Sequence, residues 1–98
     1  MTPSDVRHNE AENRFEAEVN GQLAVAEYER TGDTIRFFHT QVPQEFQGRG
    51  IGESMAKAAL DYSRDNELHV VPLCQFIDAY MRKHPEYAGL RQKKKTQE

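Results

Sequence analysis

An Asn20-Gly21 dipeptide joins two stretches of alternating apolar and polar residues, and it constrains the fold more than any other feature of the chain. Residues 14–19 alternate between apolar and charged side chains, which is the period of a half-buried strand. Asn-Gly suits the type I′ turn of a tight hairpin because both of its central residues need positive φ. Residues 14–19 and 22–29 are therefore predicted to pair as antiparallel strands.

A third strand is predicted over residues 34–42, after a turn at Thr31-Gly32-Asp33. The first half of the chain then reads as an antiparallel meander, and residues 6–8 are expected to add a short edge strand. Strict alternation assigns the third strand two faces. One carries Ile35, Phe37 and His39, and the other carries Phe38, Thr40 and Val42.

The second half of the chain predicts a helix, a strand and a second helix. Residues 51–65 place Ile51, Met55, Ala58, Ala59 and Tyr62 on one helical face, with Leu60 on the polar side. Asn66 is expected to end this helix in the left-handed conformation. Residues 68–73 read as a buried strand, and the apolar residues from Phe76 to Met81 repeat at helical spacing until His84-Pro85. A strand, a helix and a strand in sequence favour a parallel pair with a right-handed crossover, so the fold class is α+β.

Length and composition limit the kind of protein this is. With 98 residues, 37% of them hydrophobic, the chain is expected to form a single domain over residues 1–98, with residues 91–98 as a frayed basic tail. The net charge of −3 argues against non-specific binding to nucleic acid. The longest uncharged apolar run, residues 70–73, is too short to cross a bilayer, and the first residues lack the pattern of a signal peptide. A cytoplasmic location is therefore expected.

Cysteine and histidine usage gives no sign of a metal site. The single cysteine, Cys74, excludes an intrachain disulfide and a cysteine-rich zinc site. The four histidines are scattered without the spacing of metal ligands. The sequence therefore predicts no bound metal.

Three glycines, Gly48, Gly50 and Gly52, stand where the third strand leads into the first helix, with Arg49 between two of them. Such a loop lets backbone N–H groups approach an anion that the helix dipole also favours. The alternative is that the glycines only allow close packing of helix and strand. The spacing fits neither a Walker loop nor a dinucleotide fingerprint.

The segment Gln47-Gly48-Arg49-Gly50-Ile51-Gly52 resembles the Q/R-x-x-G-x-G/A signature of GCN5-related N-acetyltransferases, the GNAT family. Residues 39–43, residues 70–74, Tyr80 and residues 84–87 are similar to its small single-domain members, so the likeness spans about residues 15–90. The resemblance implies a GNAT-like fold. In it an antiparallel meander is followed by a strand-helix-strand crossover with splayed parallel strands and a C-terminal helix.

The resemblance also implies a site for acetyl-coenzyme A, the co-substrate of the family. The pantetheine arm would lie along the strand before the glycine motif, and the pyrophosphate would lie on the amides that open the helix. The residues implied are Thr40, Gln41, Val42, Gln47, Gly48, Arg49, Gly50, Ile51, Gly52 and Glu53. The expected reaction moves an acetyl group to a primary amine, such as that of a protein or peptide. The alternatives are a non-catalytic module that binds or carries coenzyme A and a purely structural interaction domain.

Three residues are candidates for catalysis under this resemblance. Cys74 would lie near the thioester, either protonating the departing thiolate or accepting the acetyl group, and its place before a helix N-terminus favours the thiolate. A lone cysteine is also commonly a small core residue. Tyr80 matches a tyrosine that relatives use as general acid, with packing as the alternative. His39 is a possible general base or a structural histidine.

Two departures from larger relatives concern the acceptor. Tight turns replace the two helices that join the first strands of those enzymes, and the sequence ends soon after Leu90. The acceptor side is therefore expected to be open, suited to a protein or peptide substrate or to completion by a partner. The sequence specifies neither the acceptor, nor the acyl chain, nor the oligomeric state.

Overall fold

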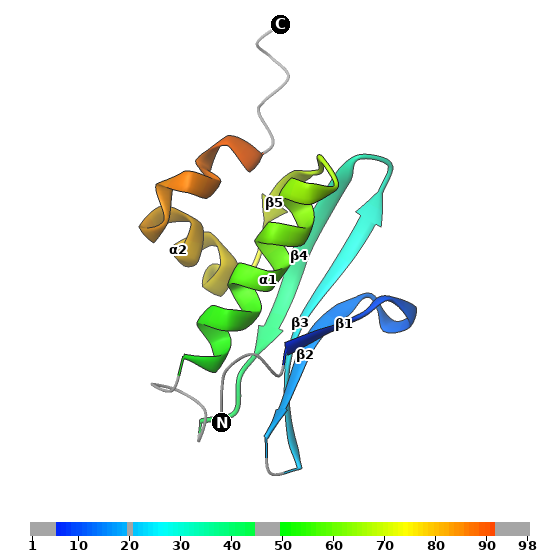
Figure 1. The fold of residues 1–98 in the computed structure, drawn as a ribbon, viewed down its shortest axis with the longest axis vertical. Helices are drawn as coiled ribbons and strands as arrows, with labels where there is room; N and C mark the ends of the chain where they lie inside the picture. Colours follow the sequence, from blue (N-terminus) through cyan, green and yellow to red (C-terminus); the bar gives the residue numbers. More distant parts are fainter. Residues whose placement is uncertain (1–5, 20, 45–49, 92–98) are drawn as a thin grey trace, which may run out of the picture.

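The computed structural model describes residues 6–19, 21–44 and 50–91, which form a mixed sheet with helices packed against it (Figure 1). The strands are β1 (Val6–Asn9), β2 (Arg14–Val19), β3 (Gln22–Thr31), β4 (Thr34–Gln41) and β5 (His69–Pro72). The helices are α1 (Ile51–Asp65) and α2 (Gln75–Lys83), with 3-10 turns η2 (Glu10–Glu12) and η4 (Pro85–Leu90). Among the helices described, none has the length and apolar character to cross a membrane.

The five strands lie in chain order across the sheet, from β1 at one edge to β5 at the other. The pairs from β1 to β4 are antiparallel, which confirms the predicted meander and its edge strand. Strands β4 and β5 are parallel, with Ile35 opposite Val70, and α1 connects them. The predicted α+β fold with a strand-helix-strand crossover is therefore confirmed.

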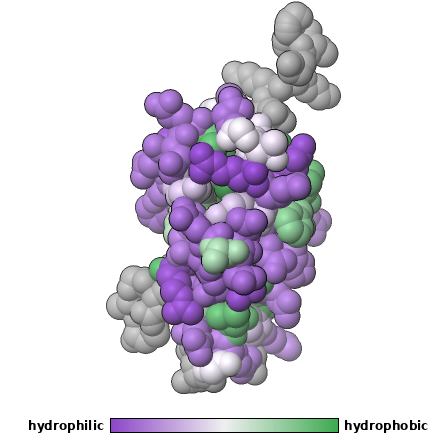
Figure 2. Space-filling model, turned by 90° about the vertical axis from the view of Figure 1, so that its right-hand side faces the viewer, coloured by the Kyte–Doolittle hydropathy of each residue, from purple (hydrophilic) through white to green (hydrophobic). Residues whose placement is uncertain are grey.

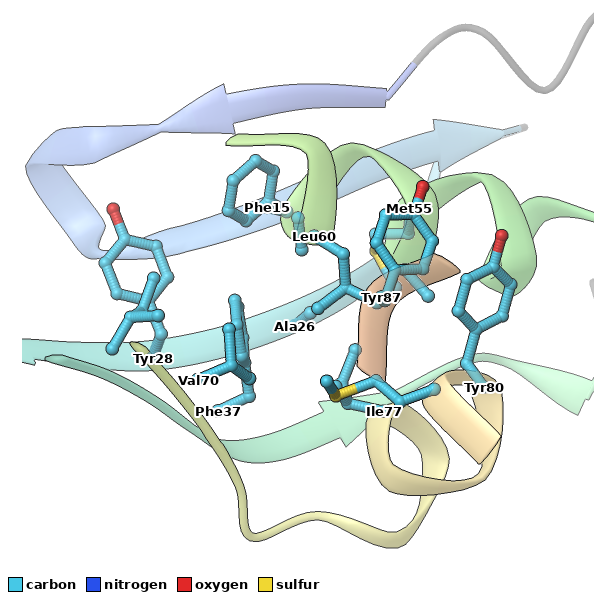
Figure 3. Close-up of a cluster of buried hydrophobic side chains, with 14 of the residues drawn as sticks. Phe15, Ala26, Tyr28, Phe37, Met55, Leu60, Val70, Ile77, Tyr80 and Tyr87 are labelled. Carbon is cyan, nitrogen blue, oxygen red and sulfur yellow. The ribbon is translucent and has the colours of Figure 1, made fainter. Parts of the chain in front are cut away.

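A single apolar core lies between the sheet and the helices (Figure 3). Phe15, Ala26, Tyr28 and Phe37 enter it from β2, β3 and β4, while Met55, Leu60, Ile77 and Tyr87 enter from α1, α2 and η4. The surface view in Figure 2 is largely hydrophilic, with small separate hydrophobic areas. The large apolar side chains exposed among the described residues are Leu23, Phe38 and Leu73.

The buried face of α1 differs from the prediction. Ile51, Met55 and Ala59 are buried as expected, but Leu60, which was placed on the polar side, is also fully buried. Ala58 and Tyr62 are only partly buried. The reason is that α1 packs against β2 and β3 and also against α2 and η4, so its buried stripe is wider than a single row of side chains.

The end of α1 also differs by one residue. Asn66 has a φ of −103°, and Glu67 takes the left-handed conformation with a φ of 56°. The Leu68 N–H donates to the Ser63 carbonyl at 2.9 Å, and the Glu67 N–H donates to the Arg64 carbonyl at 3.1 Å. These two bonds make a Schellman motif, whose left-handed residue is the second after the last helical one. The prediction that Asn66 is the left-handed residue was wrong.

A β-bulge in β4 changes which side chains share a face. Tyr28 of β3 pairs with Phe37, whereas the preceding Glu27 pairs with His39, so Phe38 is an extra residue in β4. Thr40 pairs with the buried Ala26 and therefore shares the face of Phe37. His39 lies on the other face and is exposed. Phe38 is exposed, as its predicted face implies, and the predicted faces are reversed from His39 onward.

A buried carboxylate ties the edge strand β1 to β2. Glu16 is 3% exposed, and its carboxylate accepts hydrogen bonds from Arg14 at 2.8 Å and from Arg7 at 3.0 Å. Asn9 of β1 adds longer contacts at 3.4 Å. The Arg14 guanidinium lowers the pKa of Glu16 below its ordinary value, with help from Arg7 and Asn9. The ionised form of Glu16 therefore stabilises the fold.

We expect this stabilisation to depend on pH. Because the pKa of Glu16 is lowered on folding, its contribution is complete above the unfolded value of about 4.3 and is lost as pH falls through the folded value. Glu16→Gln should therefore reduce the free energy of unfolding by about 1–3 kcal/mol at pH 7 and have a much smaller effect at an acid pH below the folded value. Urea unfolding at both pH values measures this. Glu18→Gln, at an exposed position of the same strand, is the control. An equal loss for Glu16→Gln at both pH values would contradict the assignment.

Candidate functional site

The parallel pairing of β4 and β5 ends at Phe37 and Pro72. The Phe37 carbonyl accepts hydrogen bonds from the N–H groups of both Leu73 and Cys74, each at 3.0 Å. Strand β4 continues to Gln41, while the chain after β5 turns into α2. The end of β4 is therefore left without a β5 partner within the described residues, next to the first turn of α2.

Cys74 lies at this divergence as the N-cap residue of α2. Its Sγ atom is 3.0 Å from Thr40 Oγ1, and the side chain is partly buried. The sulfur makes no capping hydrogen bond to the helix. The structure thus brings Cys74 together with Thr40, two residues that the sequence analysis assigned to separate roles.

The two described glycines of the motif have different physical reasons to be glycine. A Cβ atom on Gly52 would lie 2.9 Å from Phe76 Cζ and 3.5 Å from Val42 Cγ2, so Gly52 allows α1, α2 and the end of β4 to approach closely. Gly50 has a φ of 80° and open space around it, so its conformation and not its size requires glycine. The packing alternative therefore accounts for Gly52 and not for Gly50.

The first turn of α1 presents backbone donors close to this junction. The Ser54 N–H donates to the Gly50 carbonyl at 2.9 Å and starts the helical pattern. The preceding N–H groups, those of Ile51, Gly52 and Glu53, have no acceptor within the helix, and Gly50 has no side chain to cap them. Such amides at the positive end of a helix suit an anion. Gln47, Gly48 and Arg49 lie outside the described residues.

The remaining strand residues predicted to contact a cofactor are Gln41 and Val42. Gln41 is exposed and pairs with Val25, on the sheet face opposite to that of Thr40. Val42 is partly buried, packs against the core and lies close to Gly52. Thr40, Val42, Gly52 and Cys74 therefore form one junction between the end of β4 and the first turns of both helices.

Tyr80 lies on the last turn of α2, and no hydrogen bond in the described part of the chain joins it to Cys74 or Thr40. Its ring stacks on His84 with centroids 4.0 Å apart and is 6.1 Å from the ring of Tyr87. Burial raises the pKa of Tyr80, and the ammonium of Lys57 opposes that shift. No hydrogen bond joins the Tyr80 hydroxyl to another described residue. The Tyr80 side chain is surrounded by the rings of His84 and Tyr87 and by charged residues of α1.

His39 also faces away from Cys74. The bulge turns its exposed side chain to the sheet face opposite Thr40, where its cross-strand neighbour is Glu27. Within the part of the chain that the structure covers, no group of three or more His, Cys, Asp or Glu side chains is arranged to hold a metal ion. The junction brings together four of the described candidate residues, Thr40, Val42, Gly52 and Cys74.

Sequence reasoning missed the Thr40 hydroxyl and the ring of Phe76 as parts of this junction. Strict alternation predicts that Thr40 and Phe37 lie on different faces of the strand, so the contact of Thr40 with Cys74 was not expected. The adjacent Phe37 and Phe38 break the expected apolar-polar alternation and are the signal from which the bulge could have been predicted.

We expect Gly52→Ala to destabilise the protein through contact with Phe76. In the wild-type background the added methyl should cost about 1–3 kcal/mol by overpacking. In a Phe76→Leu background the same change should be neutral or stabilising by up to about 1 kcal/mol, because alanine is the better helix former. Urea unfolding of the four proteins measures this coupling. Gly50→Ala is the control, because its cost comes from positive φ and should not change with Phe76→Leu. Equal costs of Gly52→Ala in both backgrounds would contradict the packing role.

Comparison with known proteins identifies relatives along most of the chain. The model of a family described as GCN5-related N-acetyl-transferase matches residues 14–90. Protein NATD1 of Xenopus tropicalis is 36% identical over 91 residues, which cover 87% of this chain and 84% of that protein. Protein NATD1 of Homo sapiens is 36% identical over 86 residues, covering 85% and 76% respectively. The solution NMR structure of a GCN5-like protein from Staphylococcus aureus matches with a TM-score of 0.72 at 26% identity, covering 97% of this chain and 94% of that one.

Proposed function

The chain belongs to the GCN5-related N-acetyltransferase family, and from this premise we propose that it binds acetyl-coenzyme A and transfers the acetyl group to a primary amine. The observation that carries the proposal is the junction of β4, α1 and α2, where Cys74 lies beside Thr40 and where Gly52 in the first turn of α1 lies close to Val42 and Phe76. We place the reaction in the cytoplasm, in keeping with the composition of the chain.

The first turn of α1 has the properties required to hold the pyrophosphate of coenzyme A. The N–H groups of Ile51, Gly52 and Glu53, which have no acceptor within the helix, can donate to phosphate oxygens, and the helix dipole favours the negative charge. We assign the same task to the loop residues Gln47, Gly48 and Arg49 on the basis of the family motif. The absence of a side chain at Gly50 leaves the approach to these amides open.

The end of β4 has the properties required to hold an extended chain. Beyond Phe37 this strand has no β5 partner among the described residues, so Thr40, Gln41 and Val42 can offer backbone groups to the amides of a pantetheine arm. A ligand running from the α1 amides along this strand reaches the neighbourhood of Cys74. The thioester is therefore assigned to that position.

Cys74 can assist acetyl transfer in two ways. In direct transfer, the amine attacks the thioester carbonyl and the Cys74 thiol donates its proton to the departing coenzyme A thiolate. In covalent transfer, the Cys74 thiolate attacks the carbonyl, coenzyme A leaves, and the amine then takes the acetyl group from the cysteine. Both routes need the sulfur to be accessible, and Cys74 is partly exposed.

We expect the binding of acetyl-coenzyme A to be sensitive to negative charge at Gly50. Gly50→Asp would place a carboxylate beside the α1 amides, where it would occupy them and repel a pyrophosphate. Gly50→Asn is the matched control, because asparagine has nearly the same shape, tolerates positive φ and is uncharged. Calorimetric titration should give an affinity for Gly50→Asp at least about tenfold weaker than for Gly50→Asn, which corresponds to about 1.4 kcal/mol. Equal affinities would show that the α1 amides do not bind the pyrophosphate. No binding by the wild type would overturn the proposal.

We expect Cys74→Ser to lower acetyl transfer strongly while acetyl-coenzyme A still binds. The measurement is coenzyme A release in an amine screen, together with intact mass spectrometry of protein mixed with acetyl-coenzyme A. A gain of one acetyl group in the wild type that is absent in Cys74→Ser supports the covalent route, and transfer without that gain supports the direct route. Binding without transfer to any amine would favour the alternative of a non-catalytic coenzyme A module.

A further inference from the structure

We propose that the protein acetylates its own C-terminal lysines, Lys93, Lys94 and Lys95, which reach the junction along the free edge of β5. The inference rests on the proposed function and names an acceptor for it. It is carried by Arg91, the last residue that the structure describes, which is attached both to β5 and to α2. The three lysines themselves lie outside the described residues.

Arg91 fixes the point from which the C-terminal segment starts. It forms a parallel bridge with Val70 of the edge strand β5. Its guanidinium lies 2.9 Å from the Asp78 carboxylate of α2 and 3.5 Å from the Asp78 carbonyl oxygen. Its N–H donates to the Ala88 carbonyl at 3.3 Å. Backbone and side-chain contacts together therefore place Arg91 beside both elements.

This starting point is linked to the junction through both elements. Asp78, which pairs with Arg91, donates its N–H to the Cys74 carbonyl at 3.2 Å. Val70, which bridges to Arg91, comes four residues before Cys74 in the chain. The C-terminal segment therefore starts next to the two elements between which Cys74 lies.

The direction and the length of the segment suit the junction. Because the bridge is parallel, a chain that continues from Arg91 alongside β5 runs toward Cys74. Arg91 itself is extended, with a φ of −60° and a ψ of 137°. Four residues separate Val70 from Cys74 and the same number separates Arg91 from Lys95, and an extended chain covers up to about 14 Å in four residues. The lysine amines are therefore within reach of the junction.

The free edge of β5 suits a segment of the same chain better than a strand from another molecule. The N–H groups of His69 and Leu73 donate toward β4, so those of the alternate residues Val70 and Pro72 would point to the free edge. Proline has no N–H, and a separate strand would lose a hydrogen bond there. A tethered segment tolerates that loss because its effective concentration is high. We therefore assign the edge to the C-terminal segment.

Arginine and lysine have different tasks in this arrangement. Arg91 keeps its charge and binds Asp78, whereas a lysine can lose a proton and attack as a neutral amine. The lysine nitrogen forms a bond to the thioester carbonyl carbon, and the carbon–sulfur bond breaks. The sulfur of coenzyme A leaves with the electron pair and takes up the proton that the nitrogen releases. The products are acetyl-lysine and coenzyme A.

The test is to incubate the protein with acetyl-coenzyme A without an added amine and to follow each lysine by peptide mass spectrometry. Neutral hydroxylamine removes any acetyl thioester on Cys74 and leaves acetyl-lysine intact. Lys83, exposed at the end of α2, is the internal control for chemical acetylation. We expect Lys93, Lys94 or Lys95 to react at least about tenfold faster than Lys83, at a rate per molecule that does not depend on protein concentration.

Arg91→Ala tests the attachment of the segment, and Arg82→Ala is the matched control. Both arginines pair with Asp78, but only Arg91 also bridges to β5 and leads into the C-terminal segment. Arg91→Ala should lower the rate at the three lysines about threefold to tenfold, and Arg82→Ala should leave it within about twofold. Thermal unfolding checks that each variant is folded, and Arg91→Gln replaces Arg91→Ala if the latter is not.

The results separate this inference from the proposed function. A wild type that binds acetyl-coenzyme A and acetylates an added amine, but modifies the C-terminal lysines no faster than Lys83, overturns the inference alone. The inference also fails if the rate per molecule rises in proportion to protein concentration, or if Arg91→Ala and Arg82→Ala have equal effects. A wild type that does not bind acetyl-coenzyme A overturns the proposed function and this inference with it.

Discussion

The Phe37 carbonyl is the point on which the arrangement of the site depends. Within the described residues it is the last β4 carbonyl that pairs with the chain after β5, and it receives the N–H groups of both Leu73 and Cys74. Two donors on one carbonyl end the parallel ladder and turn the chain into α2 immediately afterwards. Cys74 is therefore fixed at the N-terminus of a helix, while the end of β4 stays without a strand beside it. A single bifurcated contact thus produces both the open strand and the position of the sulfur.

Close packing and ligand binding make compatible demands on the glycine motif. Gly52 lets the ring of Phe76 approach α1, and this contact brings the first turns of the two helices together beside Val42. Gly50 supplies a left-handed N-cap without a side chain, which leaves the following amides uncapped. An anion site at a helix N-terminus needs such free amides, and it also needs the helix to be firmly placed. Packing at Gly52 provides that placement. Close packing therefore explains Gly52 and anion binding explains Gly50, and the two explanations apply to different residues of the same motif.

Much of this fold could be predicted from local patterns, because each pattern has a local cause. The Asn20-Gly21 turn, the alternation over residues 14–19 and the helical spacing after Phe76 identified the meander and the second helix. The errors arose where tertiary packing, and not the local sequence, determines which face a side chain occupies and whether it is buried. Leu60 is buried because α2 and η4 cover a side of α1 that the sheet does not reach, and the bulge at Phe38 reverses the faces of β4. For the site, the motif indicated Gly50 and Gly52, but the contact of Thr40 with Cys74 could not be found without the bulge.

The groups that stabilise the sheet and those assigned to chemistry lie near opposite edges of it. The Glu16 carboxylate and its arginines join β1 to β2, whereas Cys74 and Thr40 lie where β4 and β5 separate. A substitution at Thr40 or Cys74 leaves the Glu16 carboxylate paired. The effect of such a substitution on the site can therefore be measured while β1 stays attached to the sheet. Gly52 is different, because its neighbour Phe76 belongs to the packing of α2 and also borders the junction. Changes at Gly52 should therefore alter stability and ligand binding together, whereas changes at Thr40 should separate them.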